Sequence, residues 1–111
     1  MARRLVEQFA RNEGFGASCG DLAIIVSELV ANAFIHGREP IELTLQAFDG
    51  ELTVEVADGD ARTDVIQPDA DTQAASGGRG LRIVASLADR WGTRASQTGK
   101  TVWATVRNTN V

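Results

Sequence analysis

The apolar residues in the first third of the chain recur every three or four positions, which is the spacing of an amphipathic helix. Residues 2–13 form the first such segment, and Gly14 ends it. A second, longer helix is predicted from an N-cap at Asp21 to about His36, with Gly37 as its C-terminal cap. The residues that show this spacing on the first helix are Leu5, Val6, Phe9 and Ala10. The stripe expected to be buried on the second helix is Leu22, Ile25, Val26, Leu29 and Ala33.

After Pro40 the spacing of apolar residues changes from 3.6 to 2, which is the period of a half-buried strand. The alternating segments 41–47 and 52–56 flank Asp49-Gly50, a dipeptide typical of tight hairpin turns. This part of the chain therefore predicts an antiparallel pair of strands with one buried face.

The second half of the chain predicts a long connection, a third helix and a second hairpin. Residues 58–79 carry few large apolar side chains, and a connection of that length is usually functional or disordered. The third helix is expected to open at Gly80, and residues 91–95 and 101–106 to form the hairpin. Lys100 in its turn is expected to be solvated, with contact to an acidic partner or a ligand as the alternative. In this order the elements favour an α+β sandwich, one sheet with helices packed on one face.

Length and composition fit one soluble domain over residues 1–111, with 43% hydrophobic and 23% charged residues. Fifteen acidic and eleven basic side chains give a net charge of −4, which argues against nucleic acid and anionic membranes as partners. A single cysteine and a single histidine exclude an internal disulfide and a structural zinc site. Because no apolar run approaches about 20 residues and the N-terminus lacks an apolar signal block, we expect a cytoplasmic protein.

Glu28, Asn32 and His36 are spaced four residues apart, so on a helix they form one polar stripe at the border of the apolar face. A glutamate at such a rim can accept a proton or orient a nucleophile. An asparagine one turn later offers a neutral oxygen that suits a hard cation such as Mg²⁺. A solvated helix edge explains the same spacing, and His36 alone fits a helix end, whose negative pole favours a cation.

Two loop segments add groups that could bind a nucleotide. Asp58-Gly59-Asp60 follows the second strand, and a carboxylate there can accept a hydrogen bond from an exocyclic amine such as that of adenine. The glycine-rich stretch 77–80 leads into the third helix, so its backbone N–H groups can converge on an anion, and Arg79 adds forked donors for phosphate. An ordinary polar turn and a flexible hinge are the respective alternatives.

Taken in order, these segments resemble the motifs of the histidine kinase-like ATPase superfamily, which includes gyrase, histidine kinases and heat-shock chaperones. Residues 28–33 (ELVANA) resemble its N box, Asp58 follows a strand as its adenine-binding aspartate does, and residues 78–81 (GRGL) resemble its second glycine box. A closer resemblance, to small bacterial anti-sigma-factor serine/threonine kinases, extends over nearly the whole chain. The strings that carry it are SELVANAFIHG (27–37), GGRGLRIVASLADRWG (77–92) and GKTVWA (99–104).

The resemblance implies a Bergerat-type two-layer α/β sandwich, with a mostly antiparallel mixed sheet, that binds ATP and Mg²⁺. Glu28 would orient or deprotonate the attacking group, and Asn32 would ligate Mg²⁺. Asp58 would bind the adenine amine, Thr101 would support the adenine through water, and a lid would extend over about 59–79. The other nucleotide-binding residues that the motifs imply are Gly59, Leu81 and the phosphate-holding Gly78, Arg79 and Gly80.

In the related kinases the attacking group is a serine or threonine on an anti-anti-sigma (STAS-type) partner. The resemblance therefore implies a serine/threonine kinase that also sequesters a sigma factor. A non-catalytic or nucleotide-gated protein-binding module of the same fold is the alternative. The detached catalytic domain of a histidine kinase is less favoured, because no dimerisation helix carries a phosphoacceptor histidine and His36 lies inside the N box.

Two features depart from the family pattern. The family often has Asp-x-Gly after the strand, whereas Asp60 stands two residues beyond Asp58, and this carboxylate weakens nucleotide binding unless Gly59 takes over the close approach. The chain also begins almost at its first helix, whereas family members commonly carry a further strand that contributes to the sheet or to dimer contacts. The oligomeric state, a homodimer included, is left open.

Overall fold

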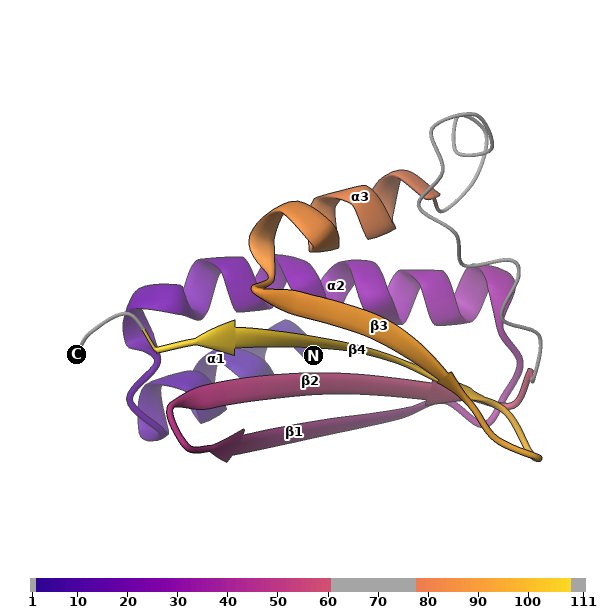
Figure 1. Cartoon of the computed structure of the whole chain (residues 1–111), viewed down its shortest axis with the longest axis horizontal. Coiled ribbons are helices and arrows are strands. Elements are labelled where there is room, and N and C mark those ends of the chain that lie inside the picture. Colours follow the sequence, from indigo (N-terminus) through magenta and orange to yellow (C-terminus); the bar gives the residue numbers. More distant parts are fainter. Residues whose placement is uncertain (1, 61–77, 109–111) are drawn as a thin grey trace.

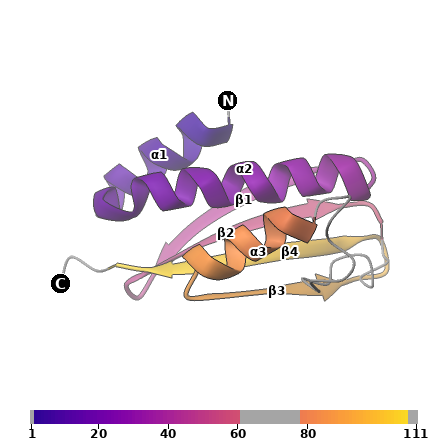
Figure 2. The same cartoon turned by 90° about the horizontal axis from the view of Figure 1, so that it is seen from above.

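The computed structural model describes residues 2–60 and 78–108, which form a layer of helices over a four-stranded sheet (Figure 1). The strand order is β1-β2-β4-β3, so β2 and β4 join the two hairpins at the centre of the sheet. Helix α2 runs along the sheet between α1 and α3 (Figure 2). The elements are α1 (Ala2–Asn12), a 3₁₀ turn (Gly16–Ser18), α2 (Cys19–His36), β1 (Glu42–Phe48), β2 (Glu51–Asp58), α3 (Gly78–Leu87), β3 (Arg90–Ala95) and β4 (Lys100–Arg107).

The predicted α+β sandwich is confirmed, with one difference in the sheet. All pairings among the described strands are antiparallel, whereas the resemblance implied a mixed sheet. The first hairpin turns at Asp49 and Gly50, whose φ angles of 55° and 77° are both left-handed. This conformation belongs to the two-residue turn whose twist matches that of the flanking strands.

Helix α2 begins three residues earlier than the sequence pattern predicts. The 3₁₀ turn leads directly into Cys19, and Ser18 occupies the N-cap position. The prediction of Asp21 as the cap was wrong, because the 3₁₀ turn continues without a break into the helix. Asp21 lies instead in the first turn, where a negative charge favours the positive end of the helix dipole.

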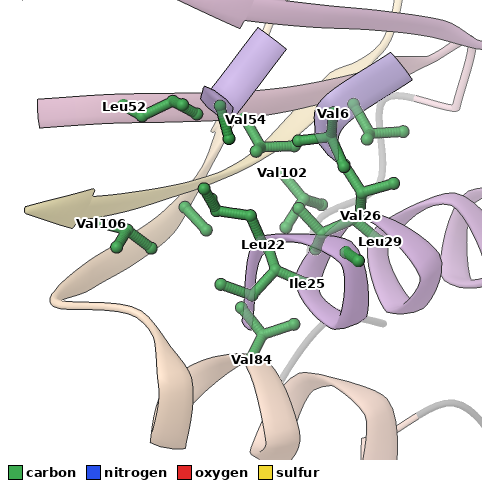
Figure 3. Close-up of a cluster of buried hydrophobic side chains, with 14 of the residues drawn as sticks. Val6, Leu22, Ile25, Val26, Leu29, Leu52, Val54, Val84, Val102 and Val106 are labelled. Atoms are coloured by element: carbon green, nitrogen blue, oxygen red, sulfur yellow. The ribbon is translucent and has the colours of Figure 1, made fainter. Parts of the chain in front are cut away.

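The hydrophobic core lies between α2 and the inner face of the sheet (Figure 3). The predicted stripe on α2 is buried, and α1 adds Val6 and Ala10. Leu5, which shares the helical spacing of Val6, is 53% exposed, because α1 packs on α2 along a narrow stripe. The core side chains from α2, β2 and β4 are Leu22, Ile25, Val26, Leu29, Ala33, Leu52, Val54, Val56, Val102, Ala104 and Val106.

The elements in the second half start earlier than predicted, β3 by one residue at Arg90. Helix α3 begins at Gly78 and not at Gly80, and β4 begins at Lys100. The expectation that Lys100 is a solvated turn lysine was wrong, since this residue is 2% exposed. Its register partner is Asp58, and the two-residue period of β4 places it on the same face as the buried Val102.

One helical segment, 16–36, is long and apolar enough by length and composition to cross a membrane. In the structure it is the central helix of the fold, and half of its most apolar stretch is buried inside the domain. The core helix of a globular protein has this character, because its apolar side chains pack on the sheet and the neighbouring helices. The chain therefore forms a small globular domain around this helix.

Candidate functional site

The sequence segments singled out for their chemistry meet at one end of the molecule. The C-terminal end of α2, the end of β2 and the first turn of α3 lie together there in both views (Figures 1 and 2). Helix α2 also packs against α3 and β2, which holds these ends in place. The tertiary structure thus brings the N-box helix, the Asp58 strand and the glycine-box helix to a common region.

On α2, the polar stripe is more buried than a solvated helix edge. Asn32 is only 5% exposed, and its side-chain amide makes no hydrogen bond with any residue that the structure describes. A buried amide without a partner is costly and calls for an ion, water or ligand at that position. Glu28, one turn earlier, is half-buried and forms no ion pair or hydrogen bond with the described residues.

At the end of β2, the Asp58 carboxylate is held by two donors. Its Oδ1 accepts a hydrogen bond of 2.7 Å from the backbone N–H of Asp60. Lys100 Nζ lies 3.2 Å from the same oxygen, and the side chains of Lys100 and Asp58 are 1% and 2% exposed. Lys100 Nζ also donates to the backbone oxygen of Asp60 at 3.3 Å. These bonds form a buried, charge-paired cluster on the helix-covered face of the sheet.

The loop after α2 lies directly against this cluster. A Cβ at Gly37 would collide with the Asp58 carboxylate group and would lie 2.7 Å from the backbone oxygen of Ala33. The backbone N–H of Gly59 donates to the backbone oxygen of Arg38 at 2.6 Å. The end of α2 and the end of β2 are therefore fixed to each other at the predicted site.

A cavity of about 360 Å³ lies at this end of the sheet, between the start of β1, the end of β2 and the β3–β4 turn. Asp58, Gly59 and Thr101 line it, whereas Glu28 and Asn32 do not. Thr101 follows Lys100 in β4, so its side chain points to the opposite face of the sheet from the Asp58 carboxylate. The structure therefore places Lys100, and not Thr101, beside that carboxylate.

Sequence reasoning favoured a solvated Lys100 over one that contacts an acidic group, although a signal for its burial was present. The apolar residues Val102, Ala104 and Val106 of β4 recur every two positions, and the same period extends back to Lys100. A strand that starts one residue earlier would have put this lysine on the inner face. Because the turn was predicted to include Lys100, the lysine was expected in solvent and not on the inner face of β4.

The glycine box forms the start of α3. Gly78, Arg79 and Gly80 make its first helical turn, and Leu81 is buried in the core. The first backbone N–H groups of a helix have no partner within the helix and attract anions. This geometry fits a phosphate group. Apart from 59–60 and 78–79, the predicted lid lies outside the described residues.

The donor groups also fit Mg²⁺ held together with a nucleotide. Among residues 2–60 and 78–108, no group of three acidic, histidine or cysteine side chains could hold a metal ion. Magnesium bound to a nucleotide commonly needs only one or two protein oxygens, because phosphates and water supply the others. The unpartnered amide of Asn32 is suited to that role, since its oxygen is buried and has no hydrogen-bond donor among the described residues.

Comparison with known proteins identifies the family. Residues 1–106 match the model of the histidine kinase-like ATPase domain. The chain belongs to this family. A search of the curated proteins found no match. Among solved structures, the chain is similar to the histidine kinase domain of the blue-light-activated histidine kinase EL346 from Erythrobacter litoralis, with 22% identity and a TM-score of 0.60.

That similarity covers 82% of this chain and 45% of the EL346 chain, and at this identity it supports the fold. The family match supports a histidine kinase-like, ATP-binding domain with a Bergerat-type sandwich. The segments that resembled the N box and the second glycine box, 28–33 and 78–81, both lie inside the matched range. The chain spans less than half of the solved relative, so the activity of a whole histidine kinase is not carried over.

Proposed function

We propose that this domain binds Mg-ATP and transfers phosphate to a serine or threonine of an anti-anti-sigma, STAS-type partner, and that it sequesters a sigma factor in the cytoplasm. The observation that carries the nucleotide part is Asn32, a buried amide with no hydrogen-bond partner among the described residues. Asn32 lies on α2, which packs against α3, and its amide oxygen would hold Mg²⁺ together with the phosphates of a bound nucleotide. The partner classes come from the resemblance of residues 27–37, 77–92 and 99–104.

The division of labour on α2 follows from burial and spacing. Asn32 would hold Mg²⁺, which when bound offsets the charge of the phosphates. Glu28 lies one turn away on the same side of the helix, is half-buried, and has no cation beside it among the described residues. A carboxylate in that state is able to orient a hydroxyl or accept its proton. The first turn of α3 would hold the phosphates through its free N–H groups.

The Asp58 cluster favours a second candidate, a protein-binding module that works without catalysis. The carboxylate oxygen Oδ1 already accepts bonds from Lys100 and from the Asp60 N–H. A purine amine would have to share this carboxylate with both donors. If Lys100 and the Asp60 N–H exclude the purine amine, the domain would bind its protein partners independently of nucleotide.

Calorimetric titration with ATP, in the presence and absence of Mg²⁺, tests nucleotide binding directly. Asn32→Leu, which keeps the volume and removes the amide, should lower Mg-ATP affinity by about tenfold or more, as loss of a metal contact does. The same variant should melt at the same temperature as the wild type or higher, because it removes an unpartnered buried amide. Asn12→Leu, at the exposed end of α1, is the matched control and should bind as the wild type.

Transfer of radiolabelled phosphate to a purified STAS-type protein tests the kinase part. Glu28→Gln should bind ATP normally and lose transfer, since the amide can neither accept the proton nor attract it. Undiminished transfer in Glu28→Gln would refute the role of this residue. ATP binding without transfer to the STAS-type protein, in the wild type, would refute the kinase and favour the binding module.

A further inference from the structure

Lys100, the buried partner of Asp58, has no role in the function proposed above. Both side chains are removed from water, with 1% and 2% of their surfaces exposed, and both residues are among those that line the 360 Å³ cavity. Burying two charges is expensive, and a hydrophobic pair of similar volume often serves stability as well or better. A pair retained at this cost, at the position where the base of a nucleotide is expected, points to recognition.

The hydrogen bonds of the pair define what a ligand would meet there. Asp58 Oδ1 accepts two donors, the Asp60 N–H at 2.7 Å and Lys100 Nζ at 3.2 Å. A lysine ammonium has three N–H groups and no acceptor. Two of them are directed to Asp58 Oδ1 and to the Asp60 backbone oxygen. The cluster thus presents a donor beside the carboxylate, in place of a carboxylate alone.

This arrangement changes the rule by which the site would select a base. An isolated carboxylate only accepts, so it favours a purine with an amine at position 6 and opposes one with a carbonyl oxygen there. An ammonium group beside it can donate to that carbonyl oxygen. We propose that Lys100 is a specificity-determining residue that lets the site accept 6-oxo purine nucleotides as well as 6-amino ones.

The proposal rests on the proposed function in one respect, that the base of a bound nucleotide lies at Asp58. Position in the fold supports the role of Lys100 itself. It is the register partner of Asp58 across β2 and β4, and Asp58 is confined on its other side by Gly37. The carboxylate therefore has little room to turn away from the ammonium group toward a ligand.

ATP and inosine triphosphate (ITP) are the probes, because they share ribose and phosphates and differ only at one edge of the purine: ATP has a 6-amino group and an accepting N1, whereas ITP has a 6-oxo group and an N1–H. Calorimetric titration of the wild type should give dissociation constants for the two that agree within about threefold. In Lys100→Met the donor is lost, and ATP should be preferred by about tenfold or more, as expected when a buried acceptor faces another acceptor. Arg94→Met removes an exposed cation of β3, paired with Glu55 at 3.2 Å, and should keep the wild-type ratio.

The outcomes separate the two proposals. A wild type that prefers ATP over ITP by more than tenfold overturns the role of Lys100 and leaves Mg-ATP binding intact. If neither nucleotide binds to the wild type or to Lys100→Met, nucleotide binding itself fails. The wild-type ratio needs no variant, so it can overturn the role of Lys100 even if Lys100→Met, with its unpaired Asp58, does not fold.

Discussion

Gly37 ends α2 and also borders the candidate site. Glycine is common after a helix because it adopts left-handed angles, yet Gly37 has φ −101° and ψ −166°, an extended conformation open to any residue. The need for a glycine at position 37 is explained by the lack of room for a side chain and not by its backbone angles. A side chain here would meet the Asp58 carboxylate group, which Lys100 and the Asp60 N–H hold in place, and the backbone oxygen of Ala33.

Gly37→Ala should therefore lower the free energy of unfolding by about 2 kcal/mol or more, the cost of forcing extra volume into a packed site. Urea denaturation measures it. Gly20→Ala is the control, because no atom lies within 4 Å of a Cβ at this helical position. That variant should stabilise the protein by about 0.5 kcal/mol, since alanine is the better helix former. Equal effects of the two substitutions would show that the contact with Asp58 is unimportant.

At the scale of elements, the hairpins set the geometry of the sheet. The β1–β2 hairpin turns in two residues, and both Asp49 and Gly50 have positive φ. This turn fixes the register that pairs Phe48 with Glu51, and through it every later pair of the two strands. The β3–β4 hairpin has a longer turn, in which the Ser96 N–H donates to the Gly99 backbone oxygen at 2.8 Å.

Gly50→Ala should destabilise the protein by about 1–2 kcal/mol through backbone strain alone, because a Cβ is disfavoured at left-handed angles. No atom lies within 4 Å of that Cβ, so crowding does not contribute. Gly16→Ala is matched in having the same open surroundings without a positive φ, and it should be neutral or slightly stabilising. Thermal or urea unfolding of both variants provides the test, and an unchanged stability for Gly50→Ala would contradict the strained turn.

At the scale of the whole molecule, the two faces of the sheet differ in character. The inner face packs on α2 and contains the core, whereas the outer face carries ion pairs in which exposed arginines of β3 reach across β4 to half-buried glutamates of β2. Arg90 lies 2.7 Å from Glu51, and Arg107 lies 3.6 Å from the same glutamate. Exposed pairs of this kind each contribute about 0–1 kcal/mol, so the inner face supplies most of the stability.

Leu22→Ala tests that dependence on a single core. Leu22 is fully buried between α2 and the sheet (Figure 3), so its truncation should cost about 2–5 kcal/mol, a large share of the stability of a small domain. Ile24, two residues further on, is 39% exposed, and Ile24→Ala should cost less than about 1 kcal/mol. The comparison uses urea midpoints, and a similar loss in both variants would argue against a core centred on α2.

The alternation of apolar and polar residues was enough to predict the elements and the fold class. A helix or strand that buries one face must repeat apolar residues with its own period. The local sequence is therefore enough to recognise a helix over Leu22 to Ala33 and strands within residues 41–56. Motif order added the family, which the match over residues 1–106 bears out. Element starts were less accurate, as at Cys19, Gly78 and Lys100, because caps and register depend on neighbours outside the local pattern.

The sequence by itself therefore determined the helices, the hairpins and which faces are buried, because each depends on residues a few positions apart. Only the tertiary structure decided that Lys100 pairs with Asp58, 42 residues away, and that Gly37 confines the same carboxylate. It also decided that the Asn32 amide is buried without a partner in the described part of the chain. Such contacts follow from how strands and helices meet in three dimensions, and no local period encodes them.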